Sequence, residues 1–147
     1  MTILMKGARQ SLGALWFIGG GIVYLLLITL SLVGRFEDQA DKVWAWFLPT
    51  TMPTLTLIAG VLATGAAKLN PQALSQEVEP FLFWASVVAS GLYLLCVALI
   101  VVVPMLAGLP VLESMHQSNL FLGPFQSIVT ALLGVFFVRS GRRGSGA

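Results

Sequence analysis

Four apolar stretches, each about twenty residues or longer and free of Asp, Glu, Lys, Arg and His, dominate the 147-residue sequence. They cover residues 14–33, 48–67, 80–106 and 120–138. An α-helix rises about 1.5 Å per residue, so about 20 residues cross the roughly 30 Å hydrocarbon core of a bilayer. Each stretch is therefore long enough to form a transmembrane helix.

The composition supports a bilayer, rather than water, as the surroundings of these stretches. Hydrophobic residues make up 57% of the chain and charged residues 10%, against roughly 25% charged residues in ordinary soluble domains. A soluble domain of this size exposes too much surface to hide so many apolar side chains. We predict an all-α integral membrane protein, a bundle of four transmembrane helices over residues 1–147 without a soluble domain.

The first stretch follows Lys6 and Arg9 and so resembles a secretory signal peptide. Its apolar run is longer than the roughly 7–15 residues of a signal core, and no small-residue cleavage motif follows it. We therefore interpret it as a retained helix. At the other end of the chain, residues 140–147 are expected to form a flexible tail.

The distribution of Lys and Arg predicts which way the helices run, because basic flanks resist translocation. Four spans place both termini and the loop 68–79 on one side of the membrane. That side holds six basic residues: Lys6, Arg9, Lys68, Arg139, Arg142 and Arg143. The opposite side holds Arg35 and Lys42. We expect both termini in the cytoplasm, in the inner (plasma) membrane of a bacterium. Since the basic residues are scattered, no nucleic acid is expected as a partner.

Three tryptophans lie near the ends of the stretches: Trp44, Trp46 and Trp84. Trp favours the headgroup level, where its ring is in apolar surroundings and its N–H stays hydrated. We interpret them as an interfacial belt, with a ligand-stacking site as the alternative.

Two prolines, Pro49 and Pro53, open the second stretch. Proline fits the first turn of a helix, so we predict a rigid, partly non-helical entry with regular helix from about Pro53. The alternatives for this entry are a packed kink and the outer mouth of a pore.

Small and hydroxyl-bearing residues recur at helical spacing in the second and fourth stretches. Such residues let membrane helices approach closely, and polar ones hydrogen-bond across the interface. The candidates for helix packing or for lining a pore are Thr50, Thr54, Thr56, Gly60, Thr64, Gln126, Ser127 and Thr130. Gln126 is the most polar of them; we favour an interhelical hydrogen bond for it over a constriction.

The residues that carry catalysis in membrane bundles are missing from the apolar stretches. Coupled carriers place ionisable side chains at membrane depth, thiol chemistry needs more than the single Cys96, and Glu113 with His116 is too small a set for a metal site. We expect no enzyme activity, no metal and no cofactor.

Two functions remain for such a bundle. In the first, several copies assemble around an uncharged pore that gates by wetting and dewetting, an architecture analogous to that of small bacterial defence proteins that depolarise membranes. In the second, the chain is a non-catalytic accessory or anchoring subunit that binds a partner through residues 68–79 or through its tail. We favour the homo-oligomeric pore because the loops offer little docking surface.

Overall fold

The computed structural model describes the backbone of residues 3–67 and 77–142, and side chains within 7–63 and 79–136. The chain forms helices α1 (Met5–Leu32), α2 (Ala40–Ala67), α4 (Pro80–Ala107) and α5 (Val111–Arg142), with a short 3₁₀ turn η1 (Glu37–Gln39) before α2. Two-residue strands, β1 (Ile3–Leu4) and β2 (Glu77–Val78), pair antiparallel at one end.

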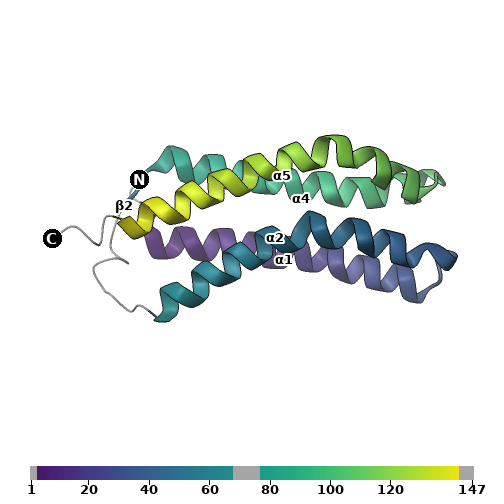
Figure 1. Ribbon diagram of the computed structural model, residues 1–147, viewed down its shortest axis with the longest axis horizontal. Helices are drawn as coiled ribbons and strands as arrows, with labels where there is room; N and C mark the ends of the chain where they lie inside the picture. Colours follow the sequence, from purple (N-terminus) through teal and green to yellow (C-terminus); the bar gives the residue numbers. More distant parts are fainter. Residues whose placement is uncertain (1–2, 68–76, 143–147) are drawn as a thin grey trace.

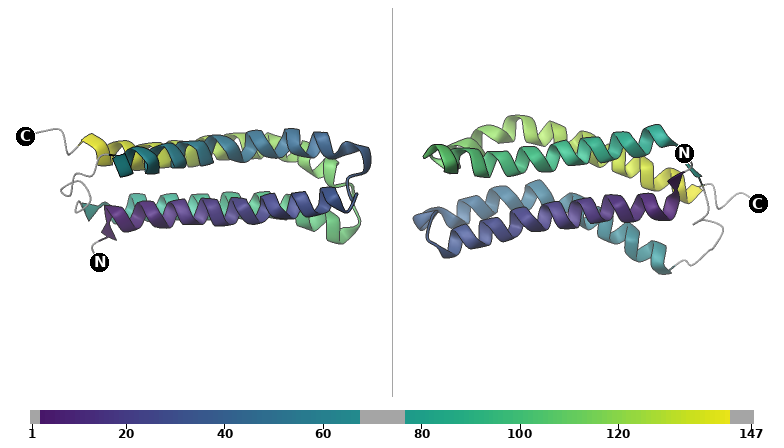
Figure 2. Two further views of the ribbon diagram at one scale, coloured as in Figure 1. Left: turned by 90° about the horizontal axis from the view of Figure 1, so that it is seen from below. Right: turned by 180° about the vertical axis from the view of Figure 1, so that it is seen from behind.

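The four helices form two hairpins that lie side by side (Figures 1 and 2). α1 packs on α2 and α4, and α5 packs on α2 and most extensively on α4. The helices therefore form a ring in the order α1, α2, α5, α4. α1 begins and α5 ends at the same end of the bundle (Figure 1).

Each helix is long and apolar enough to cross a membrane, which confirms the prediction of four such helices. The candidate spans are Gly7–Leu32, Glu37–Ala63, Pro80–Ala107 and Val111–Phe136. Between 22% and 33% of an 18-residue apolar window in each span is buried within the bundle, so most of each window faces outward. Such a surface suits lipid, and the described chain is a helical bundle with four candidate membrane spans.

The helices extend further than the apolar stretches. α2 is helical through both Pro49 and Pro53, so the expected non-helical entry is wrong. α5 starts at Val111 and continues to Arg142, so the turn before it is short and residues 140–142 are helical. Hydropathy predicts the apolar part of a helix. The helix itself extends further, because polar residues at its ends form the same backbone hydrogen bonds.

Gly108 provides the sharp turn between α4 and α5. It has a left-handed backbone conformation with φ of 68°, which glycine adopts without a side-chain clash. The amide of Leu109 donates to the carbonyl of Pro104 at 2.8 Å, which closes the end of α4. Pro110 follows, and α5 begins at the next residue.

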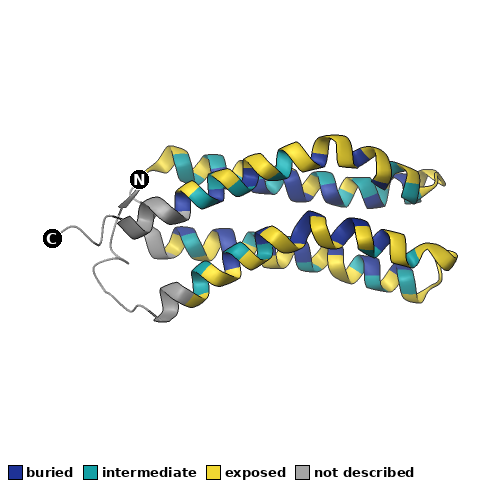
Figure 3. Cartoon of the chain, viewed as in Figure 1, coloured by how far each residue is buried: buried dark blue, intermediate teal, exposed yellow. Residues whose placement is uncertain are grey.

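All four helices contribute buried residues (Figure 3), and the largest of them form the core of the bundle. Trp16, Phe47, Tyr93 and Phe136 are among the largest fully buried residues. The rings of Trp16 and Tyr93 pack with their centroids 5.8 Å apart. The axis of the single bundle is therefore a packed core.

Candidate functional site

The proline pair disturbs the hydrogen bonding of α2. Pro49 and Pro53 have no N–H, so the carbonyls of Ala45 and Pro49, four residues earlier, lose their usual helical donors. Two threonine hydroxyls bond backwards in the same turns: Thr50 Oγ1 donates to the Trp46 carbonyl at 2.6 Å, and Thr51 Oγ1 to the Phe47 carbonyl at 2.9 Å. Prolines and such back-bonding hydroxyls bend helices, and the C-terminal part of α2 turns away from the line of its N-terminal part (Figures 1 and 2).

Side chains from the other hairpin bind the backbone of α2 at this bend. The Tyr93 hydroxyl of α4 donates to the Thr50 carbonyl at 2.7 Å. The Gln126 amide Nε2 of α5 lies 2.9 Å from the same carbonyl and 3.2 Å from that of Pro49. We call these four residues, Pro49, Thr50, Tyr93 and Gln126, the carbonyl site.

The carbonyl site meets a requirement that lipid imposes. Pro53 leaves the carbonyl of Pro49 without its helical donor, and Gln126 takes that place. A backbone carbonyl without any donor costs several kcal/mol in hydrocarbon, because no water replaces the missing partner. Tyr93 is fully buried and Thr50 is 7% exposed, so neither group reaches the surroundings freely. The hydrogen bonds therefore stabilise the bent form of α2 and connect three helices.

A second polar link joins α2 to α5 closer to the turns. The Trp46 indole Nε1 donates to Ser118 Oγ at 3.1 Å, and Ser118 Oγ donates to the Met115 carbonyl at 2.6 Å. Trp46 and Ser118 are buried. The Trp46 N–H is thus paired inside the bundle rather than hydrated at a membrane surface.

The eight candidate pore-lining or packing residues do not share one face. Thr50 and Thr54 are buried within the bundle, whereas Thr56, Gly60 and Ser127 are exposed. Gln126 and Thr130 are half-buried, and the side chain of Thr64 lies outside the described residues. Ser127 Oγ donates to the Gly123 carbonyl within its own helix, at 3.1 Å.

The three tryptophans differ in their surroundings. Trp84 is 59% exposed and lies against Phe83. Trp44 is half-buried and packs edge-on against Tyr24 of α1, with ring centroids 5.4 Å apart, and against Phe47 at 6.1 Å. Trp44 therefore fastens α1 to α2, and Trp84 has the exposure of a belt residue.

Most of the basic residues used for the topology prediction have side chains outside the described part of the structure. They are Lys6, Lys68, Arg139, Arg142 and Arg143. Arg9 is described and half-buried on α1. At the opposite end, Arg35 and Lys42 are exposed.

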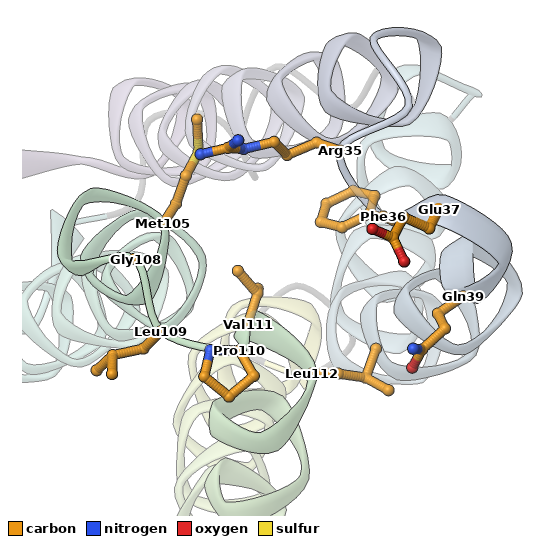
Figure 4. A pocket seen from close by; sticks show the side chains of 10 residues that line it. All are labelled: Arg35, Phe36, Glu37, Gln39, Met105, Gly108, Leu109, Pro110, Val111 and Leu112. Atoms are coloured by element: carbon orange, nitrogen blue, oxygen red, sulfur yellow. The ribbon is translucent and has the colours of Figure 1, made fainter.

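An open cavity of about 510 Å³ lies between the turns of the two hairpins. In Figure 4, Arg35 extends toward Met105 and Val111 points into the opening. A smaller groove of about 250 Å³ runs between α2 and α5 beside the carbonyl site. Ala45, Trp46, Pro49, Thr50, Asn119, Leu122, Gly123 and Gln126 line it.

Sequence reasoning missed Tyr93 and Trp16, the two aromatic residues at the centre of the core. One signal was available: Ser86, Ser90, Tyr93 and Val97 recur at helical spacing, and all four are buried. Three fully buried polar atoms in the same region, Trp16 Nε1, Thr54 Oγ1 and Ser90 Oγ, have no hydrogen-bond partner within the described part of the chain.

Among the side chains described within 7–63 and 79–136, no three His, Cys, Asp or Glu gather as they do around a metal ion. The chain matches no known protein family, no curated protein and no solved structure.

Proposed function

We propose that this protein self-assembles in a membrane through the outer face of α2 and α5 and encloses an uncharged pore between copies. The observation that carries the proposal is the unequal distribution of large apolar side chains over the outside of the bundle. A pathway between copies is favoured because packed side chains fill the axis of the single bundle.

The exposed large apolar side chains belong mainly to α1 and α4. On these two helices they are Phe17, Ile18, Ile22, Tyr24, Leu25, Leu32, Phe81, Trp84, Val88, Leu92, Leu95, Leu99, Val103 and Leu106. On the described part of α2 they are Leu48 and Met52, and on that of α5 Leu120, Phe121, Ile128 and Val135. The α1–α4 side is therefore the better lipid-facing surface.

Small residues take several outward positions of α2 and, nearer the turns, of α5. On α2 these are Thr56, Ala59, Gly60 and Ala63, and on α5 Gly123, Ser127 and Ala131. Small side chains offer lipid tails little contact area, whereas they let another helix pack closely. We call these seven residues the small-residue face.

The hydroxyls of Thr56 and Ser127 are the polar groups that this face offers to a pore. Charged rings are absent from it, so conduction is weakly selective and is controlled by wetting and dewetting. The excess of basic residues on the side of the termini supports cytoplasmic ends and a bacterial plasma membrane. Such a pore depolarises its membrane, as a defence effector does.

Assembly is tested by comparing Gly60→Leu with Gly91→Leu. A Cβ added at either glycine meets no side chain or neighbouring helix within 4 Å in the bundle, so both variants should fold. Gly60 lies on the small-residue face and Gly91 on α4. We expect Gly60→Leu to shift the protein toward monomer in single-molecule photobleaching, and Gly91→Leu to leave the number of copies unchanged. An equal number of copies in the two variants would show that this face does not form the interface.

The pore is tested separately, with purified protein in liposomes that hold an imposed K⁺ gradient. The protein should dissipate the gradient, and Thr56→Trp should reduce the flux by narrowing the path. If the vesicles stay tight although the protein is oligomeric, the pore is wrong and the accessory-subunit function takes its place.

A further inference from the structure

The two halves of α2 are held to the bundle very differently. In the first half and around the prolines, six residues are buried: Val43, Trp46, Phe47, Thr50, Thr51 and Thr54. In the second half, side chains are described from residue 55 to residue 63. Of these nine residues, one is buried, Ile58. Regions with few buried contacts open more easily than their surroundings.

The first half is anchored to both neighbours. Trp44 and Phe47 pack against Tyr24 of α1, and Trp46 is hydrogen-bonded to Ser118 of α5. Beyond Pro53, aliphatic side chains of α2 pack over glycines of α1: Leu55 lies over Gly20, and Ile58 and Leu62 lie over Gly13.

We propose that Pro49–Pro53 is a hinge in α2, and that Tyr93 and Gln126 are the latch that holds it bent. The part of α2 after the hinge, residues 55–67, is the arm that the hinge moves. The proposal depends on where the donors bind: both reach the carbonyl of Thr50, which lies within the hinge.

The latch favours the bent form because the backbone carbonyls of a bent α2 need hydrogen-bond donors that a straighter α2 supplies itself. The carbonyl of Pro49 has lost its helical donor to Pro53, and bending lengthens the hydrogen bonds of neighbouring carbonyls such as that of Thr50, so both are stabilised by outside donors. Tyr93 and Gln126 supply these donors, so the latch lowers the free energy of the bent form. Without the donors the bent form leaves carbonyls unpaired, and the equilibrium moves toward straighter or more variable positions of the arm.

The hinge has a consequence for assembly that rests on the proposed function. The arm carries Thr56, Ala59, Gly60 and Ala63, which form the α2 part of the small-residue face. Movement of the arm therefore changes the contact between copies and the width of a path between them. The hinge itself does not depend on this step, because it is measured within one chain.

The experiment places spin labels on the arm and on α5, at Ala63→Cys and Ala131→Cys, both exposed. The native Cys96 is replaced by alanine, and labelled protein is diluted with unlabelled protein so that distances within one chain are measured. Residue 63 lies about 15 Å beyond Pro53, so a change of about 20° in the bend moves it by about 5 Å. We expect Tyr93→Phe with Gln126→Met to shift or broaden the distance by this amount.

Two controls separate a hinge from general loosening. A second label pair, Ala45→Cys with Gln117→Cys, lies before the hinge and should keep its distance in the latch variant. Tyr24→Phe with Gln117→Met changes the same residue types away from the latch, and the arm distance should stay as in the parent protein.

An arm distance that is unchanged in the latch variant would overturn the proposal, and so would an equal change in both label pairs. Pro49→Ala with Pro53→Ala provides an independent check, because it restores the two missing N–H groups and should narrow the arm distance around a straighter position. If the arm responds in this way but liposomes remain tight, the hinge stands and the pore is wrong.

Discussion

At the scale of single residues, α1 and α4 approach closely because Gly19 has no side chain. A Cβ at Gly19 would lie 2.8 Å from Leu94 Cδ1, and Leu94 is itself buried. By contrast, a Cβ at Gly21, two residues further along α1, meets nothing within 4 Å. Of the three consecutive glycines 19–21, the first is thus the one that this contact requires.

We therefore predict that Gly19→Leu destabilises the bundle by about 1–3 kcal/mol, the usual cost of overpacking a closely packed core. Gly21→Leu makes the same chemical change on a more open side of α1 and should be close to neutral. Thermal unfolding in one detergent compares the two variants directly. Equal midpoints would mean that the close approach of α1 and α4 contributes little to stability.

At the scale of the helices, α2 depends on hydrogen bonds that lie between helices as well as on its own ladder. The bond from Trp46 Nε1 to Ser118 Oγ joins α2 and α5, which run side by side in the same direction (Figures 1 and 2). Both side chains are buried, so removing the Ser118 hydroxyl leaves the Trp46 N–H unpaired in apolar surroundings.

Ser118→Ala should accordingly destabilise the protein by about 1 kcal/mol, within the range measured for interhelical hydrogen bonds in membranes. Combining it with Trp46→Phe should add less than the sum of the two single effects, because both changes remove the same bond. Denaturation of the four proteins of this cycle gives the coupling energy. Strictly additive effects would show that the bond contributes nothing beyond packing.

At the scale of the whole molecule, the hairpin arrangement places the turns η1 and Gly108–Pro110 at one end and the start of α1 at the other (Figure 1). In a membrane the two ends lie on opposite sides. The basic residues favour the start of α1 on the cytoplasmic side.

Single cysteines in a Cys96→Ala background test this topology. Asp38→Cys and Leu109→Cys, both exposed at the turns, should react with an impermeant maleimide on intact cells. Gly7→Cys, exposed near the start of α1, should react after the membrane is permeabilised. Labelling of Gly7→Cys together with Asp38→Cys on intact cells would contradict both the orientation and the number of spans.

The sequence alone predicted a bundle of four long apolar helices. In four long uncharged apolar stretches, a helix is one of few structures that pair every backbone N–H and carbonyl. The sequence also singled out Gln126, Thr50 and the prolines as unusual, since polar and helix-breaking residues stand out in an apolar run. The sequence left open which partners they meet, because helical spacing fixes the face of a helix but not the neighbour that it contacts.

Tertiary structure decided that Tyr93 and Gln126 converge on the Thr50 carbonyl, although 43 and 76 residues separate them from it along the chain. It also decided that Thr54 points inward and Gly60 outward on the same helix. The preference of each helix for lipid or water depends on its own composition and can be read from the sequence. The pairing of polar groups depends on how separate helices are arranged around one another, which only the tertiary structure decides.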